Sequence, residues 1–206
     1  FYYNSILIAS DGLDAKVGTI SSDYSRFLAW KSKDGFNDDK ATVPQVETLI
    51  NGMLTKEVLI DLIKQFIVFE KSSELDSKTG LTTISTVKKV AAYHQYYAVN
   101  KAVESTIRAT ADDSSVSGLM IGEKPEKYGL SSTVEQPTGD HKAGVVWHTQ
   151  GSGKSLTMVM LVRKIRSTEA LKDYKVIMVN DRNDLEDQLG ETAELTNEKV
   201  DYVENT

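Results

Sequence analysis

The first 42 residues carry short apolar runs separated by turn signals, a pattern typical of β-strands. Ile6–Ala9 forms the first run and meets the turn pair Asp11-Gly12. Lys16–Ile20 and Phe27–Trp30 supply two further runs. This part of the chain is therefore predicted to be β-rich.

From Val43 onward the apolar spacing changes to the helical period of three to four residues. Thr55 stands where the N-cap of a helix is expected. Residues 71–81 are polar and linker-like, and residues 111–142 form a long polar insert without a period, as functional, flexible or inserted loops do. The spacing predicts three helices, over Val43–Leu54, over Lys56–Phe69, and from Val87 or Ala91 to Thr110.

In the last third, two apolar runs, Gly144–Trp147 and Val176–Val179, flank a helical segment over Gly153–Arg166. Successive apolar residues are expected of parallel strands that are covered on both faces. The order of strand, helix and strand therefore predicts a βαβ unit and an α/β fold class. Asn183 and Glu186 have the capping-box spacing of one more helix.

The loop inside this unit has the composition of a phosphate-binding loop. Gly151 and Gly153 let backbone N–H groups approach phosphates closely, at a helix N-terminus that carries partial positive charge. Lys154 is predicted to contact the β- and γ-phosphates, and the Ser155 hydroxyl to ligate Mg²⁺. His148 replaces the first glycine of the usual pattern and is interpreted as a loop-shaping residue. The alternative is a flexible loop before a helix, but the position after a buried strand favours the phosphate site. The predicted nucleotide-binding residues of the loop are Thr149, Gly151, Ser152, Gly153, Lys154 and Ser155.

The composition is that of an ordinary globular protein, with 40% hydrophobic and 26% charged residues among 206. A net charge of −6 excludes an overall basic attraction for nucleic acid, so any DNA contact must come from local groups. The absence of cysteine excludes disulfides and thiolate zinc sites, and the three histidines lack metal-ligand spacing. No apolar run approaches the roughly 20 residues that span a bilayer. The start at Phe1, without an initiator Met, predicts a part of a longer polypeptide.

Several stretches of the sequence match one known family. The strongest are Ala92–Tyr96, Trp147–Thr157 (WHTQGSGKSLT) and Asp181–Leu189. Weaker matches are Ser10–Gly12, Arg26–Lys31 and Asp61–Glu70. Together they resemble the R (restriction, or motor) subunit of type I restriction-modification enzymes. The resemblance spans nearly the whole chain except the polar insert, and helicase-like motors accept a histidine at the position of His148.

The resemblance implies a large cytoplasmic bacterial or archaeal subunit with a nuclease domain and two RecA-like motor domains. Such a subunit uses ATP and Mg²⁺ to translocate double-stranded DNA, cuts it, and docks onto methyltransferase (M) and specificity (S) subunits. Residues 1–42 are then predicted to be the C-terminal edge of the nuclease domain, and residues 43–70 the connecting helices. Residues 71–206 would be the first part of RecA-like motor domain 1, a P-loop helicase-type domain with a parallel sheet.

The resemblance also assigns roles to residues outside the loop. Gln95 matches the family's adenine-reading glutamine, and its amide can both donate and accept; the alternative is a polar residue on a helix surface. Asp181, Arg182 and Gln188 match the motif with which the first motor domain meets the DNA backbone. The alternative for these three is a helix-capping cluster with an intrachain ion pair.

Hydrolysis in such motors also needs an Asp-Glu pair, and no Asp-Glu dipeptide occurs in this sequence. The nuclease centre is expected upstream of Phe1. The chain alone is therefore expected to bind nucleotide weakly and to catalyse nothing. Three other hypotheses remain: a stand-alone helicase or translocase, a small P-loop kinase or transferase, and a nucleotide-gated interaction module. DNA-stimulated ATP turnover separates both motor hypotheses from the other two.

Overall fold

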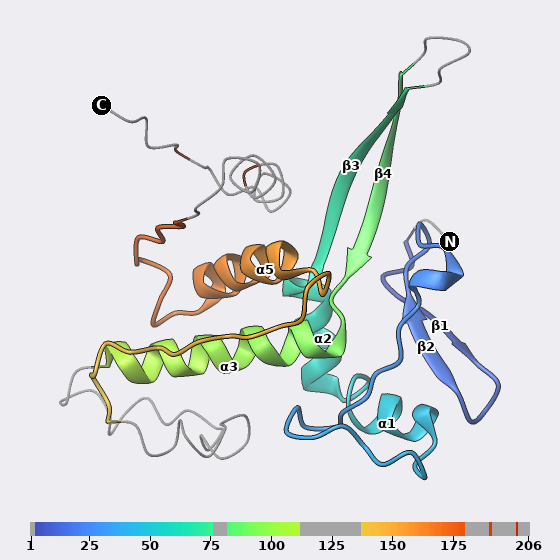
Figure 1. The fold of residues 1–206 in the computed structure, drawn as a ribbon, viewed down its shortest axis with the longest axis horizontal. Coiled ribbons are helices and arrows are strands. Elements are labelled where there is room, and N and C mark those ends of the chain that lie inside the picture. Colours follow the sequence, from blue (N-terminus) through green and yellow to red (C-terminus); the bar gives the residue numbers. More distant parts are fainter. Residues whose placement is uncertain (1–2, 76–81, 112–136, 180–189, 191–200, 202–206) are drawn as a thin grey trace.

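Two antiparallel hairpins and four α-helices make up the part of the chain that the structure describes (Figure 1). The structure is a computed structural model, and it describes residues 3–75, 82–111, 137–179, 190 and 201. This mixture of elements confirms the α/β class in its general sense.

The N-terminal segment forms a small hairpin, as its apolar runs predict. Strands β1 (Leu7–Ser10) and β2 (Ala15–Gly18) pair antiparallel, with Leu7 opposite Gly18. The Asp11 carboxylate accepts the N–H groups of Leu13 and Asp14 at 2.9 and 2.8 Å, which closes the turn. The third predicted strand is reduced to a single bridge, in which Leu28 exchanges backbone hydrogen bonds with Val17.

Helices α1 (Gln45–Asn51) and α2 (Lys56–Gln65) occupy the two predicted helical segments, but both are shorter than predicted. Thr55 is the N-cap residue of α2, as predicted, although its hydroxyl donates to the Gly52 carbonyl rather than accepting from the helix. The prediction that α2 continues to Phe69 is wrong, because the β-branched pair Ile67-Val68 opens a strand instead.

A long hairpin follows, which the sequence analysis took for the end of a helix and a linker. Strands β3 (Ile67–Leu75) and β4 (Thr82–Val90) pair antiparallel from Ile67 opposite Val90 to Leu75 opposite Thr82. The hairpin projects away from the helices in Figure 1. The polar side chains of its strands do not prevent this pairing, since the ladder is made by backbone groups.

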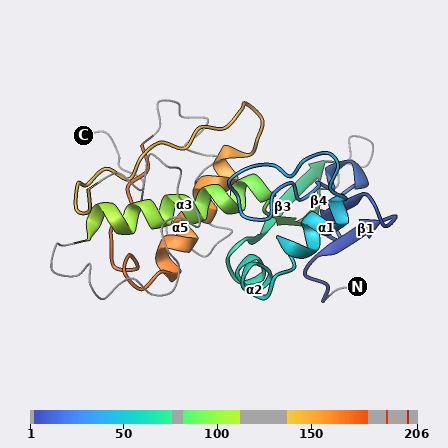
Figure 2. The ribbon, with the colours of Figure 1, turned by 90° about the horizontal axis from the view of Figure 1, so that it is seen from below.

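Helices α3 (Tyr93–Thr110) and α5 (Lys154–Ser167) pack across each other, as Figures 1 and 2 both show. α3 confirms the later of the two predicted starts, near Ala91, and α5 confirms the predicted helix after the loop. Of the polar insert, residues 112–136 lie outside the described residues, and residues 137–142 are described. They lie against the end of α3, where Arg108 pairs with Asp140 at 3.0 Å.

The core joins the N-terminal segment to α3 through aromatic rings. Trp30 is 3% exposed and its ring centroid lies 5.8 Å from those of Tyr96 and Tyr97. Phe66, which follows α2, lies 4.8 Å from Tyr96. Met160 of α5 belongs to the same buried cluster, so the N-terminal segment, α2, α3 and α5 share one core.

The predicted parallel sheet is not confirmed by the described residues, whose two sheets are both antiparallel. Residues 144–147 and 176–179 are irregular, and Val145, Trp147 and Val179 are 95%, 80% and 86% exposed. A strand needs neighbours for its N–H and C=O groups. None of the described residues pairs with either segment, so neither run belongs to a sheet of the described part of the chain. Accordingly, α5 packs against α3 and α2 rather than against a sheet.

Candidate functional site

The loop before α5 owes its shape to two glycines. Gly151 and Gly153 both have φ of +78°, in the left-handed region that other residues rarely adopt. Gly153 is also the N-cap residue of α5. A Cβ atom on Gly153 would lie 2.8 Å from the Gln95 amide nitrogen, whereas one on Gly151 would meet no atom within 4 Å. Gly153 is therefore required both by its backbone conformation and by the close approach of Gln95.

Lys154 is the first residue of α5, and its side chain folds back over the loop. Its Nζ donates to the carbonyl oxygens of His148 and Thr149, at 3.0 and 2.9 Å. The lysine is exposed and lies where the first N–H groups of a helix have no partner within the helix. An ammonium group and a helix N-terminus meet here, which makes the loop attractive to anions.

Gln95 ties the loop to the start of α3. The residue is 5% exposed, and its Nε2 donates to the carbonyl of Gly153 at 3.1 Å and, at 3.4 Å, to that of Ser152. Its Oε1 accepts the Ala92 N–H at 3.0 Å. The alternative of a polar residue on a helix surface is therefore wrong, because this side chain is buried and fully engaged as a donor.

Two histidines lie beside the loop. The rings of His94 and His148 meet edge to face, with centroids 5.2 Å apart, and His94 Nε2 lies 3.4 Å from the Ser152 carbonyl. Partial burial lowers the pKa of His148 below its ordinary value, and the neighbouring charges of His94 and Lys154 lower that pKa further. His148 is therefore a neutral residue that packs within the loop, in keeping with the loop-shaping interpretation.

Two buried polar atoms of the loop have no hydrogen-bond partner among the described residues. They are His148 Nδ1 and Ser152 Oγ. Because buried polar groups are almost always hydrogen-bonded in native proteins, such atoms mark a place where a ligand or water completes the structure. Both belong to the loop that the sequence analysis singled out.

The far end of α5 is fastened to α2, a feature that the sequence analysis missed. Arg163 donates to the carbonyls of Ile67 and Lys64, both at 2.7 Å, and Lys164 pairs with Asp61 at 2.5 Å. The cluster of cations in the last turn of α5 was visible in the sequence. Nothing local in the sequence indicates that α2 lies alongside these cations.

The structure thus brings together one group of predicted site residues. The loop and the first residues of α5 contain Thr149 and the segment Gly151–Ser155. Gln95, at the start of α3, binds this loop through the Gly153 carbonyl. The predicted DNA-contact residues Asp181, Arg182 and Gln188 lie outside the described residues, as does the capping-box pair Asn183 and Glu186.

Comparison with known protein families matches the same part of the chain. The family model described as SWI2/SNF2 ATPase matches residues 94–206, more than half of the chain, beginning at α3 and including the whole loop. The chain belongs to the SWI2/SNF2 ATPase family.

Curated relatives of this SWI2/SNF2 ATPase chain extend the similarity towards the N-terminus. The type I restriction enzyme HindI endonuclease subunit of Haemophilus influenzae is 39% identical over 93% of the chain and 15% of the relative. A putative type I restriction enzyme MjaIXP endonuclease subunit of Methanocaldococcus jannaschii is 30% identical over 92% of the chain and 16% of the relative. The chain thus spans about one sixth of the length of these relatives. No solved structure matches the chain.

These relatives confirm the resemblance to the R subunit of type I restriction-modification enzymes. Within the described part of this SWI2/SNF2 ATPase chain, no helix is long and apolar enough to cross a membrane. The same residues contain no group of three or more His, Cys, Asp or Glu side chains that would hold a metal ion on their own.

Proposed function

We propose that the loop 148–155 and the start of α5 bind the triphosphate of ATP, as the nucleotide site of a DNA-translocating motor. The geometry of the loop carries this proposal. Gly151 and Gly153 hold left-handed conformations, and Lys154 stands at the first turn of a helix of 14 residues. Membership of the SWI2/SNF2 ATPase family supports the same conclusion.

The residues present fit a nucleotide with its metal ion. Phosphate oxygens would give Ser152 Oγ and His148 Nδ1 the partners that these buried atoms lack among the described residues. Lys154 Nζ would exchange the carbonyls of His148 and Thr149 for phosphate oxygens, which are stronger acceptors because they are charged. Ser155 would supply a hydroxyl ligand to Mg²⁺, an ion that neutralises charge on the β- and γ-phosphates.

Gln95 is proposed to face the adenine as well as the loop. Its amide hydrogens are engaged by the carbonyls of Gly153 and Ser152, but among the described residues its carbonyl oxygen accepts only the Ala92 N–H. A carbonyl oxygen has two lone pairs, so one remains for the exocyclic amine of adenine. On this account the same side chain senses the base and holds the loop.

In the complete protein, the proposed role is that of an R subunit, which translocates double-stranded DNA with ATP and cleaves it together with M and S subunits. The relatives are named endonuclease subunits, which supports the cleavage part of this role. Residues 1–42 would form the C-terminal edge of the nuclease domain, and residues 43–70 would connect it to the motor. Residues 71–206 would form the first part of a RecA-like motor domain. Asp181, Arg182 and Gln188 would meet the DNA backbone.

ATP hydrolysis by the complete protein, assembled with its M and S subunits, tests this function. Turnover is measured with and without duplex DNA that carries the recognition site, for the wild type and for Lys154→Ala. The matched control is Lys175→Ala, which removes an exposed cation outside the loop. The proposal predicts DNA-stimulated turnover that Lys154→Ala abolishes and Lys175→Ala leaves intact.

Two other outcomes separate the alternatives. Turnover that is stimulated by DNA without any DNA cleavage would make the protein a translocase rather than a restriction subunit. Turnover that is indifferent to DNA, or unchanged by Lys154→Ala, would contradict the motor and favour a P-loop transferase or a nucleotide-gated module.

A further inference from the structure

Two imidazole rings meet where the phosphate loop contacts α3. His148 belongs to the loop, and His94 is the second residue of α3. Their rings pack edge to face, with centroids 5.2 Å apart. His94 Nε2 also lies 3.4 Å from the Ser152 carbonyl, which Gln95 of the same helix contacts as well. The two rings are therefore part of the contact that fixes the loop to α3.

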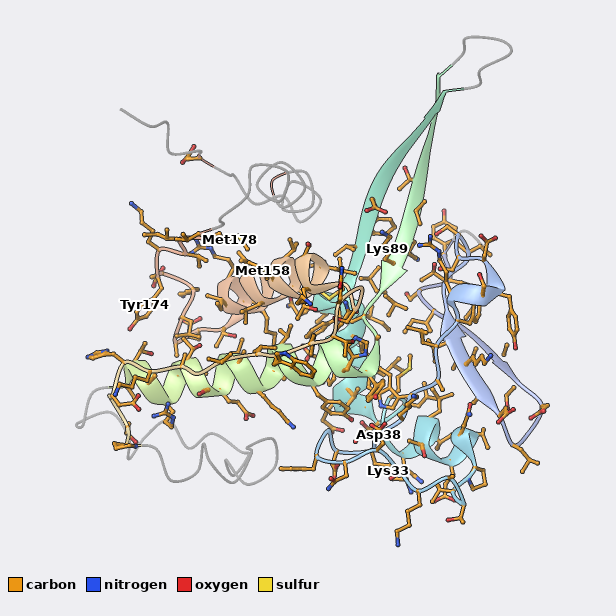
Figure 3. The ribbon with its side chains drawn as sticks, viewed as in Figure 1. Lys33, Asp38, Lys89, Met158, Tyr174 and Met178 are labelled. Carbon is orange, nitrogen blue, oxygen red and sulfur yellow. The ribbon has the colours of Figure 1, made fainter. Side chains whose placement is uncertain are left out.

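The charged groups that act on the His148 ring within the described residues are Lys154 of α5 and His94 of α3. Lys154 Nζ donates to the His148 carbonyl at 3.0 Å. Beyond His94, the ring of Tyr93 lies 5.5 Å away, and its hydroxyl donates to Asp38 at 3.3 Å. Figure 3 shows Asp38 on the N-terminal segment, below the start of α3. The groups closest to His148 thus oppose a positive charge on its ring.

The free loop also offers no acceptor for an added proton. An imidazolium carries an N–H donor on both nitrogens, whereas the neutral ring carries only one. Nδ1 of His148 is buried and has no hydrogen-bond partner among the described residues. A protonated ring would therefore leave a buried donor unsatisfied in addition to its repulsion by Lys154. Both conditions favour the neutral ring in the free protein.

A bound triphosphate reverses both conditions. Its negative charge outweighs that of Lys154, and a nearby negative charge favours the protonated form of an imidazole. Its oxygens also accept hydrogen bonds, as the buried Nδ1–H of an imidazolium requires. The electrostatic part needs no direct contact with the ring, because charges interact over a screening length of about 8 Å at physiological ionic strength.

We infer that a nucleotide bound at the loop places a proton on His148, whose imidazolium then adds to the positive charge of the phosphate site. His94 is a positioning residue that holds this ring and opposes its protonation in the free protein. The inference rests on the proposed nucleotide site and assigns a role in binding to the side chain of His148. Because the complex binds the proton more tightly than the free protein does, nucleotide affinity rises as the pH falls.

The test counts the protons that the complete protein takes up when it binds Mg-ATP. Calorimetry at neutral pH in two buffers of different ionisation enthalpy gives this number, and titrations at several pH values give the affinity. The variants are His148→Gln, His94→Gln and Lys154→Ala. The matched control is His141→Gln, which removes the third histidine of the chain, an exposed residue outside the loop.

The wild type should take up a large fraction of one proton. Its affinity should rise by up to about tenfold for each unit as the pH falls from about 8 to about 6, the limit that one linked proton sets. His148→Gln should lose this uptake, and His141→Gln should retain it. His94→Gln should move the effect to higher pH, because one of the charges that oppose protonation of His148 is removed.

Binding of Mg-ATP by the wild type without proton uptake would overturn the inference, and this result needs no variant to fold. Full uptake by His148→Gln would overturn it too, as would loss of uptake in His94→Gln alone, which places the proton on His94. Lys154→Ala separates these failures from that of the proposed function. If this variant binds Mg-ATP with wild-type affinity, the nucleotide site itself is wrong.

Discussion

At the scale of single residues, the loop depends on one buried amide. Both polar atoms of the Gln95 amide are hydrogen-bonded. Its Oε1 accepts the Ala92 N–H, and its Nε2 donates to the Gly153 carbonyl. Gly153 in turn has no room for a side chain beside that amide. This hydrogen bond couples the conformation of Gly153 to the side chain of Gln95, although the two residues are 58 positions apart in the sequence.

Gln95→Glu should destabilise the protein by about 1–3 kcal/mol. The substitution keeps the size of the side chain but replaces the donor with a carboxylate oxygen that faces the carbonyls of Gly153 and Ser152. Urea unfolding measures the effect, with Gln150→Glu as control, because Gln150 is exposed and the same negative charge is added to the same loop. Equal stability of the two variants would show that the Gln95 amide does not hold the loop.

The imidazole of His148 should titrate below 6.5, its ordinary pKa. Burial and the neighbouring charges disfavour the imidazolium in the folded state, while the unfolded chain takes up the proton near 6.5. The stability that this group supports is therefore complete above pH 6.5 and falls as the pH drops below it. NMR titration of the ring signals measures the pKa directly.

Lys154→Ala tests whether the neighbouring positive charge lowers the pKa of His148. It removes one of the positive charges that lower the pKa of His148, so the pKa should rise in the variant. A pKa of His148 at or above its ordinary value in the wild type would contradict the burial of this ring in the loop.

At the scale of elements, α5 links the loop to the rest of the molecule. Its first residue is Lys154 and its last turns hold α2, through the bonds of Arg163 to the carbonyls of Lys64 and Ile67. The last carbonyls of a helix have no partner within it, so Arg163 caps α2 at the Lys64 carbonyl and also holds the Ile67 carbonyl at the start of β3.

Arg163→Ala should lower the free energy of unfolding by about 1–2 kcal/mol, because it leaves the carbonyls of Lys64 in α2 and Ile67 in β3 without their charged donor. Arg163→Lys should recover only part of this loss, since one ammonium cannot span both carbonyls as the guanidinium fork does. Chemical denaturation compares these variants with Lys175→Ala, which lies outside the contact. If Arg163→Ala is no more destabilising than Lys175→Ala, α5 is not fastened to α2 in this way.

The elements also show where sequence patterns suffice and where they fail. The period of Val58 and Leu62 predicts α2, but nothing local reveals that Ile67 pairs with Val90. A strand is defined by its partner, and the partner of β3 is found beyond a polar stretch that reads as a linker. For the same reason the apolar runs at Val145 and Ile177 read as buried strands, although neither pairs with any described residue.

At the scale of the whole molecule, the aromatic core joins the N-terminal segment to the helices. Trp30 packs against Tyr93, Tyr96 and Tyr97 of α3, with ring centroids 5.8–6.4 Å apart. The sequence analysis placed Trp30 and α3 in separate domains, at the edge of a nuclease domain and within a motor domain. Buried residues of both segments belong to one core cluster.

The two tryptophans of the chain make this core testable. Trp30→Ala should cost about 3–5 kcal/mol, because Trp30 is 3% exposed, whereas Trp147, at 80% exposed, should tolerate the same change within about 0.5 kcal/mol. Urea denaturation of both variants gives the comparison. Similar losses for the two would contradict either the burial of Trp30 or the exposure of Trp147.

The candidate site was more predictable than the fold around it. The loop from Thr149 to Ser155 is specified by local sequence, since glycines, a lysine and a helix start are contiguous in the chain. The attachment of Gln95 to Gly153 comes from packing between distant segments. Such packing leaves no period or motif in the sequence, so only the structure reveals it.

The central claim is that the loop at Lys154 binds the triphosphate of ATP, and the affinity for Mg-ATP tests it most directly. Calorimetry on the complete protein compares the wild type with Lys154→Ala and with the control Lys175→Ala. Loss of one charge-assisted contact predicts that Lys154→Ala weakens binding by about 10- to 100-fold, and that Lys175→Ala binds like the wild type. Wild-type affinity in Lys154→Ala would contradict the claim and move the nucleotide, if one binds, away from this loop.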